Sequence, residues 1–251
     1  MNNDAIRQAA DLLADARRSG VLLAALPAAC RPHDVDDAHA IQDATVATLG
    51  DAVAGWKVAK AHDGRVVRGV LLQSRVFDSP ARIRASLVPL LGVEAEIAFR
   101  FEHALPARDS EYTYAEIAAA VIALPAIEVV DSRYQVYRDA PVLERFADCV
   151  SNGAFVQGAA QPRWRQFDLA QIAVALTIDG ALVEQRNGGH PTVDPLLPAV
   201  TLANHLRTRG GVAAGRVMTT GTYTKLAFAK PGQTVVATFT GFGLAEVRFE
   251  P

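Results

Sequence analysis

The chain has 251 residues, half of them hydrophobic and 21% charged, and its formal net charge is −2. This composition is typical of a globular protein with a substantial buried core, and no basic cluster indicates nucleic-acid binding. The two cysteines, Cys30 and Cys149, form no CxxC pair, so neither a zinc site nor a disulfide framework is predicted.

The chain also shows no sign of export or membrane insertion. Residues 1–19 are rich in Asp and Arg and lack the apolar stretch of a signal peptide. The longest apolar runs are shorter than a membrane helix requires. We therefore expect a cytoplasmic protein that has neither nucleic acid nor a membrane as a partner.

Two helices are predicted at the N-terminal end. Residues 4–18 carry apolar side chains at i, i+3, i+4 spacing, which is typical of an amphipathic helix. A second helix is expected over residues 36–49, with Asp34 or Asp36 as its N-cap and Gly50 at its end.

The pattern that follows is β-like. Short strands are expected over residues 53–59 and 69–77, with a turn at Asp63-Gly64 between them and a break at Pro80. Further along, we expect a strand over residues 87–101, a helix over residues 112–122 and a strand over residues 124–130.

The C-terminal part is predicted to contain one helix among strands. Residues 172–178 alternate in polarity and run into an Asp-Gly hairpin signal at residues 179–180. A helix is expected from Asp194-Pro195 to Gly210, because Pro favours the first helical turn and Gly the end of a helix. Three further strands are expected over residues 216–223, 233–239 and 244–249.

These elements indicate an α+β protein with a β-rich body. We expect residues 1–52 to form an N-terminal helical region and residues 53–251 to form a β-rich catalytic domain, the two making up one structural unit.

A pair of carboxylates in the strand over residues 87–101 is the first candidate site. Side chains two apart on a strand point to the same face, so Glu94 and Glu96 would lie side by side. A solvent-facing surface strand could explain this pair. The opposite face of the strand would belong to the core, with Val93, Ala95, Ile97, Phe99 and Phe101.

A third carboxylate, Glu128, lies in an apolar run, where an unpaired charge would be costly to bury. A salt bridge to Arg133 could compensate it. Alternatively, the three carboxylates together could hold a hard divalent cation such as Mg²⁺, Mn²⁺ or Ca²⁺, because these ions prefer oxygen ligands.

Other polar residues are candidates with structural alternatives. Lys57, among apolar neighbours on a predicted strand, could have a lowered pKa and act in acid–base chemistry, or could extend to solvent. The Thr-Thr-Gly-Thr run at residues 219–222 could bind a carboxylate or form a simple turn. His190, Asp148 and Ser151 could be site residues or could stabilise loops.

Three motifs in this order and spacing resemble the fumarylacetoacetate hydrolase superfamily. They are Gly-Trp-Lys-Val at residues 55–58, Val-Glu-Ala-Glu-Ile-Ala at residues 93–98 and Leu-Pro-Ala-Ile-Glu-Val-Val-Asp-Ser-Arg at residues 124–133. The resemblance spans roughly residues 35–250 and is strongest to the branch of 2-keto-4-pentenoate hydratases and 2-oxo-3-hexenedioate decarboxylases.

The resemblance implies a β-rich fold of that family's type, a mixed β-sandwich or roll with peripheral helices, in a homo-oligomer. It also implies an Mg²⁺ or Mn²⁺ site in which Glu94, Glu96 and Glu128 take the ligand positions. The branch's lysine beside the metal corresponds to Lys57, our candidate catalytic residue.

The substrate implied by the resemblance is a small 2-oxo acid. Thr220 and Gly221 fall where the family binds the 2-oxo acid carboxylate, and Ser151 is a further substrate-binding candidate. Hydratases of the branch often carry an acidic residue in an Asp-Phe-Gly-like stretch, whereas this chain has Leu-Gln-Ser-Arg at residues 72–75. Arg75 could therefore favour a substrate with a second acid group.

The leading hypothesis is a metal-dependent hydratase that adds water to an unsaturated 2-oxo acid such as 2-hydroxypenta-2,4-dienoate, in aromatic catabolism. A 2-oxo-3-hexenedioate (4-oxalocrotonate) decarboxylase and a carbon–carbon hydrolase of an acylpyruvate remain alternatives, because all three reactions stabilise charge on the same 2-oxygen. A catalytically silent member is a further alternative, supported by the missing acidic residue near Leu72.

Overall fold

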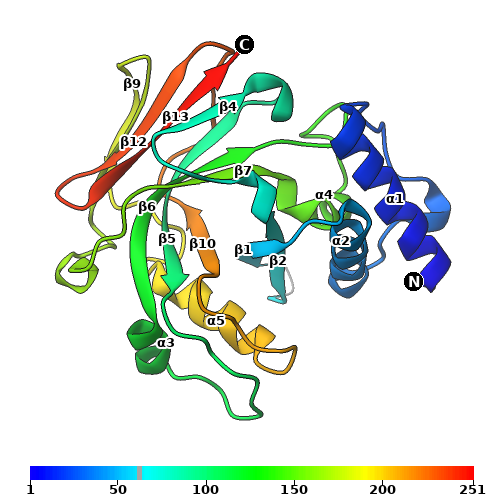
Figure 1. The fold of residues 1–251 in the computed structure, drawn as a ribbon, viewed down its shortest axis with the longest axis horizontal. Helices are drawn as coiled ribbons and strands as arrows, with labels where there is room; N and C mark the ends of the chain where they lie inside the picture. Colours follow the sequence, from blue (N-terminus) through cyan, green and yellow to red (C-terminus); the bar gives the residue numbers. More distant parts are fainter. Residues whose placement is uncertain (61–63) are drawn as a thin grey trace.

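The computed structural model describes residues 1–60 and 64–251, with Ala59 and Lys60 described by their backbone alone. The turn expected at Asp63-Gly64 therefore lies partly outside the described residues, since Asp63 is not among them. Figure 1 shows a helical end, with α1 and α2, and a larger β-rich body.

The two N-terminal helices are confirmed with their caps. Helix α1 (Asn3–Ser19) begins after Asn2, whose side chain accepts a hydrogen bond from the Ala5 N–H, and ends at a left-handed Gly20. Helix α2 (Val35–Leu49) begins after Asp34, which caps it in the same way, and ends at Gly50. Both helix ends are thus set by local side-chain and backbone hydrogen bonds.

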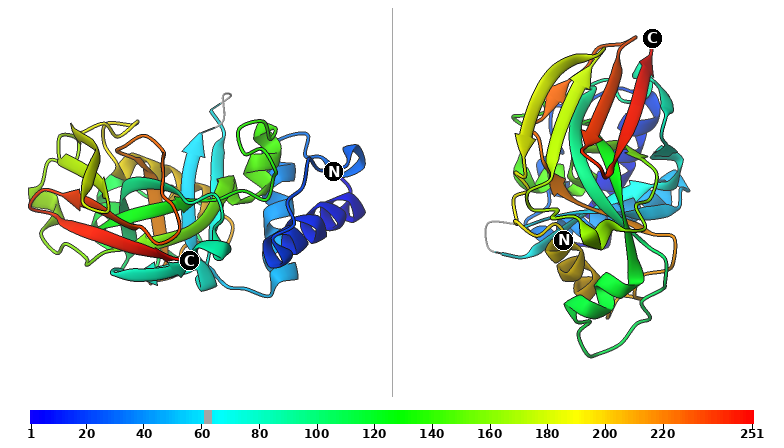
Figure 2. Two further views of the ribbon diagram at one scale, coloured as in Figure 1. Left: turned by 90° about the horizontal axis from the view of Figure 1, so that it is seen from above. Right: turned by 90° about the vertical axis from the view of Figure 1, so that its left-hand side faces the viewer.

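The helical region packs onto a third helix, α4 (Val142–Ala147), through a small apolar core. Leu13 and Ile41 contribute to this core from α1 and α2, and Tyr134 lies in it just ahead of α4. Figures 1 and 2 place α1 and α2 at the end of the molecule opposite the smaller sheet. The domain boundary between residues 52 and 53 stays a prediction.

The larger sheet carries the candidate site. In the described part of the chain its strand order is β2-β1-β10-β5-β6-β7-β3, and β11 pairs with β5. The strands are β1 (Val53–Lys60), β2 (Val66–Leu72), β3 (Val76–Asp78), β5 (Gly92–Phe101), β6 (Val121–Val130), β7 (Asn152–Gln157), β10 (Val217–Thr222) and β11 (Ala227–Phe228).

A second sheet covers one face of the first. Its order is β4-β13-β12-β8-β9. The strands are β4 (Ala81–Arg84), β8 (Ala173–Ile178), β9 (Ala181–Asn187), β12 (Thr234–Phe239) and β13 (Gly243–Glu250). Phe99 and Val129 of the larger sheet share one buried core with Phe239 and Val247 of the smaller one. The predicted apolar face of β5 is therefore confirmed as the face between the sheets.

Two more helices complete the body. Helix α5 (Leu196–Leu206) lies against β1, β2 and β10, and α3 (Tyr114–Ala120) packs beside it. None of the helices in the described residues has the length and apolar character needed to cross a membrane. The α+β class with a β-rich body and peripheral helices is confirmed.

Several predicted boundaries were wrong in the first half of the β-rich body. Residues 69–77 do not form one strand, because a 3₁₀ turn at Gln73–Arg75 separates β2 from β3, which pairs with β7 instead of β1. Strand β5 begins at Gly92 and not at residue 87, since a 3₁₀ turn and a left-handed Leu91 precede it.

Two helix ends were also wrong. Strand β6 begins at Val121, inside the helix predicted over residues 112–122, because the ladder with β5 extends to the pair Phe101 and Val121. The β-branched Val121 and Ile122 suit that ladder better than a helix. Helix α5 ends at Leu206, before Gly210.

The parallel contact between β1 and β10 generates a stability prediction. Gly55 pairs with Val217, and a Cβ at this glycine would overlap the Val217 carbonyl. Gly55→Ala should therefore push the two strands apart and lower the free energy of unfolding by about 1–3 kcal/mol. Urea denaturation measures this effect, and the exposed Ala52→Ser should stay within about 0.5 kcal/mol of the wild type. Equal midpoints for Gly55→Ala and the wild type would contradict the close approach.

Candidate metal centre

Four strands that lie side by side in the larger sheet, β1, β10, β5 and β6, bring the predicted residues together. Glu94 on β5 pairs directly with Glu128 on β6, and Lys57 on β1 pairs with Thr219 on β10. Carboxylate oxygens of Glu94, Glu96 and Glu128 all lie within 4.8 Å of one another. The same-face arrangement predicted from the Glu-x-Glu spacing therefore exists, and Glu128 joins it.

The larger sheet must curl to close this site. Four strands separate β2 from β7 in the sheet order, which would put them roughly 24 Å apart in a flat sheet. Yet β2 and β7 contact each other, and Leu71 of β2 shares an apolar cluster with Phe155 of β7. The carboxylates thus occupy a concave face, whose interior beneath them is filled by the apolar side chains of Leu71, Ala98, Leu124, Ala126, Phe155 and Val217.

The carboxylates are buried with too little positive charge. Glu96 is 2% exposed and Glu128 is fully buried, and the Oε2 atom of Glu128 has no hydrogen-bond partner among the described residues. Burial, with the negative charge of Glu128 added, raises the pKa of Glu94 to about 7. Burial, with the negative charges of Glu128 and Glu94 added, raises the pKa of Glu96 well above its usual range.

This environment fits a hard divalent cation. Three close carboxylates repel one another, and a buried oxygen without a partner carries a desolvation cost that an ion would remove. Carboxylate oxygens are the ligands that Mg²⁺, Mn²⁺ and Ca²⁺ prefer. Arg133 does not compensate Glu128, because its guanidinium is paired with Asp131 and Asp148. The salt bridge considered from the sequence is therefore wrong.

Lys57 is the cationic partner of Glu128. Its Nζ also donates to the Val150 carbonyl at 3.2 Å, and its side chain is 14% exposed. Burial lowers the pKa of Lys57, but the negative charge of Glu128, Glu94 and Glu96 outweighs burial, and the net direction is upward. The lowered pKa expected from the sequence is thus wrong for the metal-free site, because the lysine faces three carboxylates.

A strained turn positions the Val150 carbonyl. Cys149, Val150 and Ser151 have φ angles of 51°, 53° and 59°, in the left-handed region that non-glycine residues rarely adopt. A β-branched residue such as Val150 is especially unfavourable there. No sequence pattern predicts this turn, which places Ser151 at the wall of the site.

Only part of the Thr-Thr-Gly-Thr run, which forms the end of β10, contacts the carboxylates. The Thr219 hydroxyl and the Gly221 N–H both donate to the Glu96 carboxylate. The Thr220 hydroxyl instead donates to the Ile97 carbonyl at 3.3 Å. The Thr220 carbonyl lies 3.0 Å from Nε2 of His190, a histidine whose pKa burial lowers to about 4. His190 is therefore neutral and supports the loop.

A cavity of about 180 Å³ opens beside the carboxylates. Lys57, Glu94 and Ser151 line it, as the sequence predicted for a site. Sequence reasoning missed Tyr137 and Arg145, which line the same cavity from the segment around α4. They belong to no motif that the chemistry of the carboxylates would have suggested.

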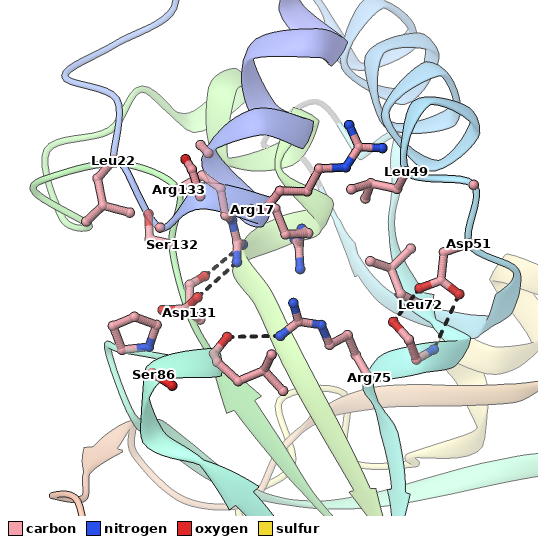
Figure 3. A pocket seen from close by; sticks show the side chains of 18 residues that line it. Arg17, Leu22, Leu49, Asp51, Leu72, Arg75, Ser86, Asp131, Ser132 and Arg133 are labelled. Carbon is pink, nitrogen blue, oxygen red and sulfur yellow. Dashed lines mark hydrogen bonds and ion pairs between the residues drawn. The ribbon is translucent and has the colours of Figure 1, made fainter. Parts of the chain in front are cut away.

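Arg75 lies in a different cavity, of about 560 Å³, where Figure 3 shows it near Arg17 and Arg133. Its Nη1 donates to the Leu87 carbonyl at 2.9 Å. Burial, and then the charges of Arg17 and Arg133, lower the pKa of Arg75 to about 10. Among the described residues, the structure therefore does not bring Arg75 to the cavity lined by Lys57 and Glu94.

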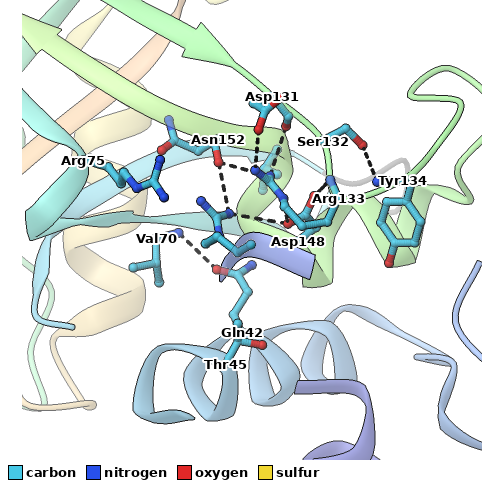
Figure 4. A network of polar contacts seen from close by, with 12 residues as sticks. Gln42, Thr45, Val70, Arg75, Asp131, Ser132, Arg133, Tyr134, Asp148 and Asn152 are labelled. Carbon is cyan, nitrogen blue, oxygen red and sulfur yellow. Dashed lines mark hydrogen bonds and ion pairs between the residues drawn. The ribbon is translucent and has the colours of Figure 1, made fainter. Parts of the chain in front are cut away.

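A buried polar network runs from Arg133, which lines the larger cavity, to the Glu128 carboxylate, and Figure 4 shows the part of it around Arg133, Asp148 and Asn152. The Asn152 side chain donates to Glu128 Oε1 at 3.1 Å, while its backbone carbonyl accepts from Arg17 and Arg133, each at 3.1 Å. Asp148 accepts from Arg133 Nε at 2.6 Å. Asp148 thus balances the charge of Arg133, and the network fixes the amide that holds Glu128.

Comparison with known proteins agrees with this site. A family model described as "Fumarylacetoacetate (FAA) hydrolase C-terminal" matches residues 51–250. A 2-keto-4-pentenoate hydratase of Paraburkholderia phymatum is 32% identical and covers 99% of this chain and 98% of its own. The same-named protein of Burkholderia vietnamiensis is 31% identical over 99% of this chain and 98% of its own.

A solved structure shares the fold over nearly the whole length. It is described as 4-oxalocrotonate decarboxylase from Pseudomonas putida G7 complexed with magnesium and adipate. It superposes with a TM-score of 0.83 at 22% identity, covering 99% of this chain and 98% of its own.

The raised pKa of Glu94 predicts how the stability of the metal-free protein depends on pH. The folded protein holds this proton with a pKa of about 7, against an ordinary value of 4.5, so the unfolded chain releases it more readily. The stability that protonation confers is complete below about pH 4.5 and is lost as the pH rises through about 7. Glu94→Gln removes this loss, so its Tm in EDTA should exceed that of the wild type by an amount that grows by a few degrees from pH 5 to pH 8.

Differential scanning calorimetry of both proteins across this range checks the prediction. The exposed Glu102→Gln serves as the matched control and should follow the wild type at every pH. A constant Tm difference between Glu94→Gln and the wild type would show that Glu94 does not titrate in this range.

Proposed function

The chain belongs to the fumarylacetoacetate hydrolase family, and on that premise we propose that it is a divalent-metal-dependent hydratase. Its substrate would be an unsaturated 2-oxo acid such as 2-hydroxypenta-2,4-dienoate. Relatives named 2-keto-4-pentenoate hydratase, 32% and 31% identical over 99% of this chain, support the reaction class.

The Oε2 atom of Glu128, which has no partner among residues 1–60 and 64–251, is the observation that carries the proposal of a metal. Glu94, Glu96 and Glu128 would hold Mg²⁺ or Mn²⁺ by their carboxylates, and their mutual repulsion would be relieved. A bound cation of this kind supplies Lewis-acid stabilisation of negative charge on the 2-oxygen of a 2-oxo acid.

Lys57 would move the proton that hydration requires. Its Nζ borders the cavity and stays protonated while the carboxylates are charged. Neutralisation of those carboxylates on metal binding would lower the pKa of Lys57 and make its ammonium a better acid. The hydrogen bond from the Lys57 Nζ to the Val150 carbonyl would hold the ammonium in place during the proton transfer.

The remaining residues would orient the substrate. Ser151 lines the cavity, and the Gly221 N–H donates to the Glu96 carboxylate. We assign Ser151 to the carboxylate of the 2-oxo acid, because a hydroxyl is a suitable donor to an anion. For Thr220 and Gly221 this role stays a prediction from the resemblance, since the Thr220 hydroxyl donates to the Ile97 carbonyl and the Gly221 N–H donates to Glu96. We leave Arg75 out of this set, since it lines the other cavity.

A 4-oxalocrotonate decarboxylase is the second candidate. The observation that favours it is Arg145, a cation in the cavity that could bind the second carboxylate of such a substrate. The two reactions can be separated by measuring CO₂ release and loss of the dienol absorbance, with 2-hydroxypenta-2,4-dienoate and with 4-oxalocrotonate as substrates. The cytoplasmic location and the homo-oligomeric state stay predictions from the sequence.

Glu96→Gln tests the metal proposal. Removing one of three carboxylate ligands should reduce the rate of hydration of 2-hydroxypenta-2,4-dienoate by more than about 100-fold. Even mutation of a residue that only hydrogen-bonds to a metal ligand typically costs about 10- to 100-fold in metal affinity or activity. The same variant should lose the increase in Tm that Mg²⁺ or Mn²⁺ gives the wild type.

The exposed Glu102→Gln is the control and should keep both turnover and the metal-dependent Tm. Unchanged turnover in a folded Glu96→Gln protein would count decisively against the proposal. A wild-type protein that binds metal and yet turns over neither substrate would be a catalytically silent member.

A further inference from the structure

The cavity that Arg75 lines is separate from the candidate metal centre and gathers three arginines. Its volume is about 560 Å³, and within the described part of the chain it shares no lining residue with the cavity beside the glutamates. Arg17 comes from α1, Arg75 from the 3₁₀ turn between β2 and β3, and Arg133 from the segment after β6. Figure 3 shows their side chains converging on the same space. Segments far apart in the sequence thus bring positive charge to one cavity.

The carboxylates around this cavity are already engaged by other groups. Asp131 and Asp148 both pair with Arg133, which is 2% exposed. The same Asp148 is the ion-pair partner of Arg17, at the longer distance of 3.5 Å. Asp51 accepts hydrogen bonds from the backbone and the hydroxyl of a neighbouring serine. These carboxylates therefore compensate Arg133 and Arg17 before any third arginine.

Arg75 is the arginine in this cavity that lacks an ionic partner. Within the described residues it forms no ion pair, and its hydrogen bond runs from Nη1 to the Leu87 carbonyl at 2.9 Å. Burial, and then the charges of Arg17 and Arg133, lower its pKa to about 10, while Asp131 offsets only part of this effect. The local potential at the Arg75 guanidinium is therefore positive, and an anion bound there would relieve the repulsion.

The unused edge of Arg75 suits an oxyanion. Its Nε and Nη2 atoms have no hydrogen-bond partner among the described residues, and neither is a buried atom, so both stay accessible to a ligand. These two donors lie on one edge of a planar group, where they can bind two oxygens of a carboxylate or a phosphate in parallel. The bond from Nη1 to the Leu87 carbonyl fixes the orientation of that edge.

The rest of the cavity wall suits the apolar part of an organic molecule. Leu22, Leu49, Leu72 and Leu87 line it together with the arginines. A volume of about 560 Å³ is far more than an inorganic anion fills and lies within the range of roughly 300–1,000 Å³ that small-molecule sites occupy. A ligand with an anionic head and an apolar body would match both parts of the wall.

We propose that this cavity is a second binding site, for a small organic anion whose carboxylate or phosphate head binds Arg75 and whose apolar body packs against the leucines. The site is distinct from the proposed substrate site and needs no metal. It gives the charge of Arg75 a ligand other than the substrate for which the sequence had suggested it.

Isothermal titration of the metal-free wild-type protein, in a buffer without phosphate or chelator, tests this proposal. Hexanoate and hexyl phosphate carry the two head groups, and hexanamide is a neutral analogue of hexanoate. The wild type should bind at least one of the two anions with a stoichiometry of one, about 10- to 150-fold more tightly than hexanamide, the range expected for hydrogen bonds to a charged group. The anion that binds more tightly identifies the head group.

Arg75→Gln should lose this difference between anion and amide. Arg145→Gln is the matched control, since it removes an arginine from the other cavity, and it should bind the anion as the wild type does. The comparison in the wild type does not depend on whether Arg75→Gln folds. Wild-type protein that binds neither anion more tightly than hexanamide, anion binding that persists in Arg75→Gln, or its loss in Arg145→Gln would each overturn the proposal. None of these results bears on the proposed function, which requires a metal.

Discussion

The excess of buried negative charge at Glu94, Glu96 and Glu128 is the constraint on which the rest of the site depends. Each nearby polar group offsets part of it: the Lys57 ammonium and the Asn152 amide at Glu128, and the Thr219 hydroxyl and Gly221 N–H at Glu96. These donors come from separate strands and loops, so compensating the charge also ties those elements together. Within the described part of the chain, one carboxylate oxygen still lacks a donor, and a divalent cation is the group that would complete the set.

Strand β5 connects this polar site to the hydrophobic core. Its alternate residues Val93, Ala95, Ile97 and Phe99 pack between the two sheets, while Glu94 and Glu96 face the concave side. The apolar face fixes the register of β5, because a slip of one residue would bury the carboxylates between the sheets. The position of the candidate metal centre is therefore held by the same packing that stabilises the fold.

The arginines near the site divide by whether the chain already uses their charge. Arg133 is fully paired with Asp131 and Asp148, and with Arg17 it holds the carbonyl of Asn152, so its contribution to Glu128 is indirect. The Nε atom of Arg145 has no such partner among the described residues. Two guanidiniums of the same chemistry thus take different parts, one in supporting the site and the other in facing the space where a substrate would lie.

The sequence by itself determined the features that depend on residues close together in the chain. The ends of α1 and α2 follow from caps within one turn, and the two faces of β5 follow from strict alternation. The three glutamates and the family also followed from local motifs. Only the tertiary structure decided that Glu128 pairs with Lys57, 71 residues away, and not with Arg133. It also decided that Arg145 and not Arg75 reaches the cavity. These pairings depend on the curl of the larger sheet and on the placement of α4 against it, which arise from contacts between segments far apart in the chain.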